Sequence, residues 1–135
     1  MLLVIDANVV FAALLNPSGM NGELLFSTKI KLISPEFLEE EFKKYIPLIA
    51  SKSGRSEADI KISFDLVLSR IEILPKSEYQ KYHQQAEQLA PDQNDVEYFA
   101  VALAFDCPLW SNDKLLKKQK RARVFSTADL LMFFK

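Results

Sequence analysis

Four acidic residues combine the chemistry of metal ligands with positions beside apolar segments: Asp6, Glu41, Asp95 and Asp113. Asp6 directly follows the apolar run Met1–Ile5, and Asp113 follows Leu109-Trp110 after a short polar link. Hard cations such as Mg²⁺ and Mn²⁺ prefer oxygen ligands, whereas carboxylates that are gathered without a cation repel one another. The four acids therefore predict one Mg²⁺ or Mn²⁺ site, which can activate water and neutralise charge on a scissile phosphate.

Alternating strand and helix patterns predict the elements that position these acids. Short apolar runs predict strands at 1–5, 32–33, 71–74, 109–110 and 124–125. Helical spacing and capping residues predict helices at 9–15, 22–28, from Ser34-Pro35-Glu36 to about 45, 56–69, 77–89, 92–105, 112–119 and 127–134. This alternation is typical of a three-layer α/β/α domain with a mostly parallel central sheet. Because ligands bind beyond the carboxyl ends of parallel strands, Asp6 and Asp113 are expected to meet there.

The other two acids lie on predicted helices, and each has a plain structural alternative. Helix geometry places Glu41 at the border of an apolar face and turns Glu40 away from that face, although the choice between them stays open. An exposed pairing of Glu41 with Lys44 is the alternative. For Asp95 the alternative is stabilisation of a helix N-terminus, and for Asp113 it is capping of the helix that follows.

Composition narrows the class of protein. The chain has 135 residues, 49% of them hydrophobic and 26% charged, which predicts one globular domain over residues 1–135. A single cysteine, Cys107, excludes an intramolecular disulfide and suits a reducing compartment. The apolar stretch 1–15 is interrupted by polar residues, lacks a basic leader and is too short to span a membrane, so we expect a cytoplasmic protein with no membrane association.

The order and spacing of these motifs resemble those of PIN-domain ribonucleases, the class that includes VapC-type toxins. The matching segments extend over essentially the whole chain: Val4–Asn8, Glu41-Phe42, Asp95 ahead of Phe99–Ala104, and Ser111–Asp113. The resemblance implies a PIN-like nuclease domain in which Asp6, Glu41, Asp95 and Asp113 are the metal ligands and catalytic residues, Asn8 supports Asp6, and Ser111 holds the strand-end geometry. It also implies an endoribonuclease that cleaves RNA phosphodiesters, acts as the toxin of a toxin-antitoxin pair, binds an antitoxin protein and forms a homodimer.

Two other functions remain alternatives. A catalytically inactive PIN-like module that binds RNA or protein would keep the fold without the hydrolase activity. An aspartyl-phosphate phosphatase would use Asp6 as a nucleophile, but Asn8 stands where such enzymes usually have a second acid. The three glycines form neither a dinucleotide fingerprint nor a P-loop. The single histidine, His83, lies on a polar helix, which favours water activated by a metal over a histidine base.

The only strong basic run is 117–123, in a chain whose formal net charge is -1. In a nuclease, Lys117, Lys118 and Arg121 are predicted to contact RNA phosphates. Because the basic side chains of the run cannot all face one way, we expect about two or three contacts. A solvated helix end is the alternative interpretation.

Overall fold

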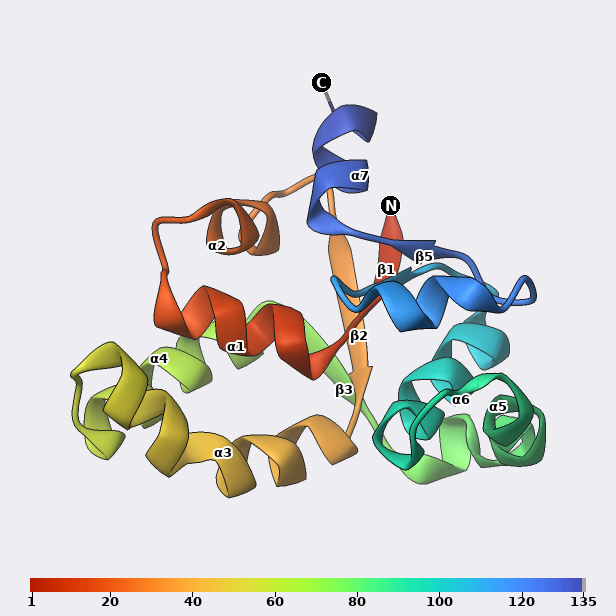
Figure 1. Cartoon of the computed structure of the whole chain (residues 1–135), viewed down its shortest axis with the longest axis horizontal. Coiled ribbons are helices and arrows are strands. Elements are labelled where there is room, and N and C mark those ends of the chain that lie inside the picture. Colours follow the sequence, from red (N-terminus) through yellow and green to blue (C-terminus); the bar gives the residue numbers. More distant parts are fainter. Residues whose placement is uncertain (135) are drawn as a thin grey trace.

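Five parallel strands form the central sheet of the computed structural model, which describes residues 1–134 (Figure 1). The strand order is β3-β2-β1-β4-β5, and every neighbouring pair is parallel. The strands are β1 (Leu2–Ile5), β2 (Lys31–Pro35), β3 (Ile71–Leu74), β4 (Leu109–Trp110) and β5 (Val124–Phe125). In the central strand, Leu3, Val4 and Ile5 are fully buried, as expected for a parallel strand that is covered on both faces.

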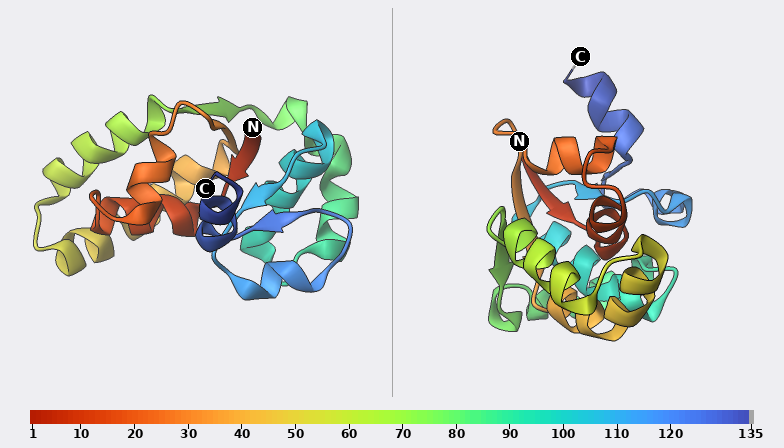
Figure 2. Two further views of the ribbon diagram at one scale, coloured as in Figure 1. Left: turned by 90° about the horizontal axis from the view of Figure 1, so that it is seen from above. Right: turned by 90° about the vertical axis from the view of Figure 1, so that its left-hand side faces the viewer.

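Helices cover both faces of this sheet (Figures 1 and 2). They are α1 (Ala7–Leu15), α2 (Met20–Leu25), α3 (Phe37–Ser53), α4 (Glu57–Leu68), α5 (His83–Leu89), α6 (Val96–Phe105) and α7 (Thr127–Phe133). Helices α1, α3 and α4 pack together on one side, while α6 packs against β1, β2 and β4 on the other side with α5 beyond it. The predicted three-layer α/β/α fold with a mostly parallel sheet is confirmed.

The start of α3 differs from the sequence prediction. Ser34 and Pro35 do not begin the helix but extend β2, where they pair with Ile73 and Leu74 of β3. The Ser34 hydroxyl is fully buried and donates to the Ile5 carbonyl at 3.1 Å, so it is not free to cap a helix. Strand pairing therefore overrides the local capping signal, and α3 begins at Phe37.

The end of α3 also differs, because the helix continues through Pro47 to Ser53. A proline inside a helix removes one backbone hydrogen bond and usually bends or ends the helix. Here Pro47 itself is exposed, while the following turn buries Ile49 and Ala50 in the core. The apolar burial favours continuation, and α3 ends where Gly54 adopts a left-handed conformation with φ of 69°.

Three other predicted helices are shorter or tighter than expected. The segment 77–89 contains the 3-10 turns η1 (Lys76–Glu78) and η2 (Gln80–Tyr82) before α5. The segment 92–105 begins with η3 (Gln93–Asp95), and 112–119 contains only η4 (Lys114–Lys118). Polar and basic residues dominate 77–82 and 114–120, so these parts have little apolar surface with which to stabilise a full α-helix. Within residues 1–134, none of the helices has the length and apolar character needed to cross a bilayer.

Candidate metal centre

Asp6 lies directly beyond the carboxyl end of β1, and the residue is only 6% exposed. Its Oδ2 accepts a hydrogen bond from Ser111 Oγ at 2.7 Å. Burial raises the pKa of Asp6 from 3.8 to about 6, against the lowering effect of the Ser111 hydrogen bond, and the charge of Asp113 raises it further. A buried carboxylate at a strand end with one hydroxyl partner suits a cation ligand.

Ser111 connects the ends of β1 and β4. Its buried hydroxyl donates to Asp6 and accepts from Asn8 Nδ2 at 3.2 Å and from the backbone N–H of Asp113 at 3.1 Å. The backbone N–H of Asp6 in turn donates to the carbonyl of Trp110 at 3.0 Å. The structure thus brings the two residues expected to support the site, Asn8 and Ser111, into one network with Asp6.

Glu41 is the half-buried member of the acidic run on α3, whereas Glu40 is exposed. Its Oε1 accepts a hydrogen bond from the Tyr98 hydroxyl at 2.6 Å. Burial raises the pKa of Glu41 from 4.5 to about 7, and the charges of Asp6 and Asp95 add to this shift. Glu41 therefore lies close enough to Asp6 and Asp95 for their charges to raise its pKa, and it forms no surface ion pair with Lys44, whose charge lowers that pKa.

Tyr98 is a residue that the sequence analysis missed. It lies on α6, is 1% exposed, and burial together with the Glu41 charge raises the pKa of its hydroxyl well above the usual range. The sequence offered one signal for this role, a tyrosine within an otherwise apolar stretch three residues after Asp95. A buried tyrosine hydroxyl needs a hydrogen-bond partner, and a nearby acid can provide one.

Asp95 and Asp113 occupy different local settings. Asp92 caps η3 by accepting from the backbone N–H of Asn94 at 2.9 Å, while the half-buried Asp95 makes no side-chain capping bond to α6. Burial raises the pKa of Asp95 from 3.8 to about 7, and the charges of Asp6, Asp113 and Asp92 contribute. Asp113, by contrast, accepts from the backbone N–H of Leu115 at 3.0 Å and caps η4.

The four acids interact electrostatically although they come from four separate segments. The charge of Asp113 raises the pKa of Asp6, and the charges of Asp6 and Asp95 raise the pKa of Glu41. The pKa of Asp95 is raised by Asp6 and Asp113. The donor set of carboxylate oxygens fits a hard divalent cation in type and charge. Nevertheless, no three His, Cys, Asp or Glu side chains of residues 1–134 already enclose a position for a metal ion. Glu41 and Asp113 are instead turned toward protein donors, so a cation would have to compete with the Tyr98 hydroxyl and the Leu115 N–H.

The remaining residues of interest form no hydrogen bond or ion pair with the four acids. His83 contacts Glu87 at 2.8 Å on the exposed side of α5. Lys117 forms an ion pair with Asp129 at 2.5 Å, and Lys118 is exposed. The Arg121 guanidinium faces the side-chain amide of Gln85 on α5. The three basic residues expected to bind RNA therefore point to different surroundings.

Comparison with known proteins gives the family. The family model of the PIN domain matches residues 4–124, while no curated protein matches the chain. Among solved structures, VapBC2 from Rickettsia felis bound to a DNA fragment from its promoter is similar, with a TM-score of 0.66 and 19% identity over 93% of this chain and 98% of that chain. VapBC-1 from nontypeable Haemophilus influenzae has a TM-score of 0.66 and 14% identity over 95% of this chain and 99% of that chain. At these identities the two structures show a similar fold only. The family assignment rests on the PIN-domain model, which matches most of the chain. The chain belongs to the PIN-domain family, as the sequence resemblance predicted.

Proposed function

We propose that this protein is a Mg²⁺- or Mn²⁺-dependent endoribonuclease whose metal ligands and catalytic residues are Asp6, Glu41, Asp95 and Asp113. The placement of Asp6 and Asp113 beyond the ends of the paired strands β1 and β4 carries the proposal, with Glu41 and Asp95 near enough to interact with Asp6. Burial and neighbouring acids raise the pKa of Asp6, Glu41 and Asp95 to about 6 or 7. Neither ion pair within residues 1–134 involves any of the four. A divalent cation is the charge that would relieve the repulsion among these carboxylates.

Each residue has a distinct part in this proposal. Asp6 is the most buried of the four acids and is oriented by Ser111, so it would provide the most rigid ligand. Glu41 is oriented by Tyr98, and Asp95 and Asp113 would complete the oxygen donors. When bound, Mg²⁺ or Mn²⁺ supplies an activated water and neutralises charge on the scissile phosphate.

The biological setting is proposed from the family and the similar folds. The two similar solved structures are VapBC structures, and the PIN-domain ribonucleases that the motifs resemble include VapC-type toxins. We infer that this chain is the toxin of a toxin-antitoxin pair, with an antitoxin protein as its partner, a homodimer as its assembly and RNA in the cytoplasm as its substrate. If the inference is right, co-expression with a small protein encoded beside it should suppress RNA cleavage, and the two proteins should co-purify. Full cleavage by the co-purified pair would contradict the antitoxin role.

The activity is tested with single-stranded RNA and the purified wild-type protein in Mn²⁺, Mg²⁺ or excess EDTA. We expect cleavage in either metal and none in EDTA. Asp6→Asn keeps the side-chain volume and removes the charge, so it should lower the rate by more than the roughly 10–100-fold typical of changes outside the ligand shell. Full cleavage in EDTA would exclude the metal mechanism, and wild-type rates in Asp6→Asn would remove Asp6 from the site. Absence of cleavage in both metals would contradict the enzyme and favour the inactive binding module.

A further inference from the structure

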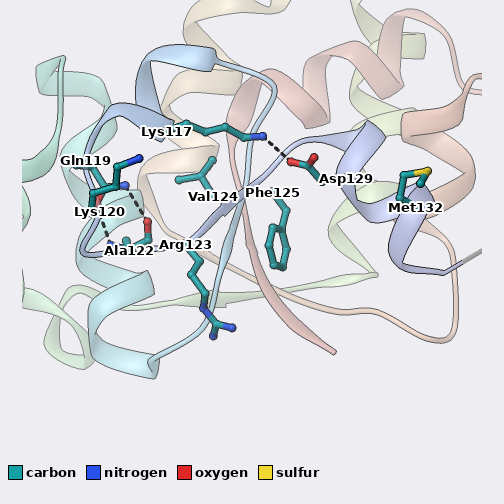
Figure 3. Close-up of a pocket in the computed structure, with 9 residues that line it drawn as sticks. All are labelled: Lys117, Gln119, Lys120, Ala122, Arg123, Val124, Phe125, Asp129 and Met132. Atoms are coloured by element: carbon teal, nitrogen blue, oxygen red, sulfur yellow. Dashed lines mark hydrogen bonds and ion pairs between the residues drawn. The ribbon is translucent and has the colours of Figure 1, made fainter.

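A cavity of about 570 Å³ has none of the four acids among its lining residues. Figure 3 shows the residues that line it. It is formed by η4, the loop that follows it, β5 and α7. Basic side chains, an aromatic ring and a thioether line it together: Lys117, Lys120, Arg123, Phe125 and Met132, with Asp129 at one side. Such a combination offers contacts both to a phosphate and to a nucleobase.

The cavity connects to the candidate metal centre through Lys117. A second cavity of about 280 Å³ is lined by Ser111, Asp113, Lys114 and Lys117, together with Asn112, Ser126 and Ala128. Lys117 therefore borders both cavities. The backbone also links them, because the Ser111 N–H donates to the Phe125 carbonyl at 3.0 Å. A bound single strand that passes Asp113 as it leaves the acids can therefore continue into the larger cavity.

The charge of the larger cavity favours an anion. Three cationic side chains and one carboxylate leave a formal charge of +2, although the whole chain carries -1. Asp129 is already paired with Lys117 at 2.5 Å (Figure 3). Among the residues that the structure describes, Lys120 and Arg123 form no ion pair, so their charges are free for an incoming phosphate.

The apolar part of the cavity suits a base. Arg123 and Phe125 are two positions apart along an extended segment, so both side chains leave the same side of β5, as Figure 3 shows. Phe125 packs against the core but is only partly buried, and Met132 on α7 is 71% exposed. An accessible ring beside a cation is the arrangement on which unpaired bases stack in proteins that bind single strands.

We propose that this cavity is a nucleotide subsite for the part of a single-stranded RNA that leaves the acids past Asp113. Lys120 and Arg123 contact its phosphates, and Phe125 stacks on one base. The inference rests on the proposed function for the identity of the strand. It differs from the sequence prediction of Lys117, Lys118 and Arg121, because only Lys117 of those three lines the cavity and its charge is paired with Asp129.

The test measures binding separately from cleavage. A labelled short single-stranded RNA is titrated with the metal-free protein in EDTA over a series of salt concentrations, so that the RNA stays intact. Each phosphate contact to a single strand contributes about 0.7 to the slope of log K against log salt. The double variant Lys120→Gln/Arg123→Gln should therefore reduce the slope by about 1.4. Lys29→Gln/Lys31→Gln removes two exposed charges at the start of β2, outside the cavity, and is the matched control, with the slope expected to stay unchanged.

The base contact is tested with Phe125→Leu, whose folding is checked by its melting temperature. Loss of one stacked base should weaken binding of single-stranded RNA about 5- to 100-fold. It should leave the salt slope and the binding of a duplex of equal length unchanged, because paired bases are not free to stack on the ring.

The outcomes separate this inference from the proposed function. An unchanged salt slope in Lys120→Gln/Arg123→Gln, an equal effect of Lys29→Gln/Lys31→Gln, or equal loss of single-strand and duplex binding in Phe125→Leu would each overturn the subsite. If the wild-type protein cleaves RNA in Mn²⁺ while the slope is unchanged, only the subsite fails. If it binds RNA with the expected slopes but never cleaves, the subsite stands and the enzyme fails.

Discussion

Glu41 and Glu40 are adjacent acids whose surroundings differ enough for a direct test. Glu41 is half-buried and electrostatically coupled to Asp6 and Asp95, whereas Glu40 is exposed. We therefore predict that Glu41→Gln abolishes metal-dependent cleavage while Glu40→Gln leaves it nearly unchanged, with initial rates on single-stranded RNA as the measurement. The reverse result would show that Glu40 is the ligand. Equal losses of cleavage rate in the two variants would mean that this turn of α3 contributes negative charge near the metal but no specific ligand.

We predict that Tyr98 acts on the proposed metal site through Glu41, because its hydroxyl donates to the Glu41 carboxylate at 2.6 Å. Tyr98→Phe removes this hydrogen bond and keeps the buried ring. We predict a metal affinity about 10–100-fold weaker, as is typical when the partner of a ligand is lost. The measurement is the rise in melting temperature during a Mn²⁺ titration, which reports binding without RNA cleavage.

Tyr79 provides the matched control for this variant. It is equally buried, and its hydroxyl donates to Glu97, which is not one of the four acids, at 2.8 Å. Tyr79→Phe should therefore leave the Mn²⁺ titration unchanged. A normal Mn²⁺ titration in Tyr98→Phe would show that the tyrosine has a packing role only.

At the scale of elements, the site depends on how β1, β4 and the start of α1 are joined. Ser111 forms this joint by contacting Asp6, Asn8 and the backbone of Asp113. We predict that Ser111→Ala lowers the free energy of unfolding by about 1–3 kcal/mol, because buried polar partners lose their hydrogen bonds, and weakens Mn²⁺ binding as well. Urea denaturation and a Mn²⁺ titration measure the two effects.

Ser34→Ala is the control at a comparable place in the sheet. Ser34 is also buried at the carboxyl end of a strand, but its hydroxyl donates only to the Ile5 carbonyl. This variant should lower stability without a specific loss of Mn²⁺ affinity. If both serine variants bind Mn²⁺ equally well, the Ser111 network does not orient a ligand.

For the whole molecule, the buried acids predict an unusual dependence of stability on pH. The pKa values of Asp6, Glu41 and Asp95 are raised to about 6 or 7 in the folded, metal-free protein. The folded state therefore binds protons at these carboxyl groups more tightly than the unfolded state does. This proton binding stabilises the folded state fully below about pH 4, and the stabilisation is lost as pH rises through about 7. Asp6, the most buried, should alone account for about 1–2 kcal/mol between pH 5 and pH 8.

Urea denaturation in EDTA at pH 5 and pH 8 measures this loss. Saturating Mn²⁺ should restore stability at pH 8, because a cation favours the charged carboxylates and binds only the folded state. Asp6→Asn should reduce the pH dependence in EDTA and make the metal-free protein more stable at pH 8. Equal stability of the wild-type protein at both pH values in EDTA would contradict the repulsion that a bound cation is proposed to relieve.

Sequence alone determined the features of this molecule that depend on local pattern. Apolar runs identified all five strands, and their alternation with helices predicted the layers, because periodicity reflects which faces must be buried. The rule that parallel strands present ligands at their carboxyl ends also placed Asp6 and Asp113 on the same edge. Which acids bind metal remains a prediction.

Only the tertiary structure decided how distant side chains pair. The Tyr98–Glu41 and Ser111–Asp6 contacts join residues that are 57 and 105 positions apart. The first depends on how α3 and α6 approach each other, and the second depends on the pairing of β1 with β4. The same is true of α3, which continues through Pro47 because the core buries its next turn. It is also true of the basic run, where folding places Lys120 and Arg123 in one cavity and turns Arg121 toward α5. Local propensity acts on a few neighbouring residues, whereas these contacts depend on packing energy that is shared over the whole fold.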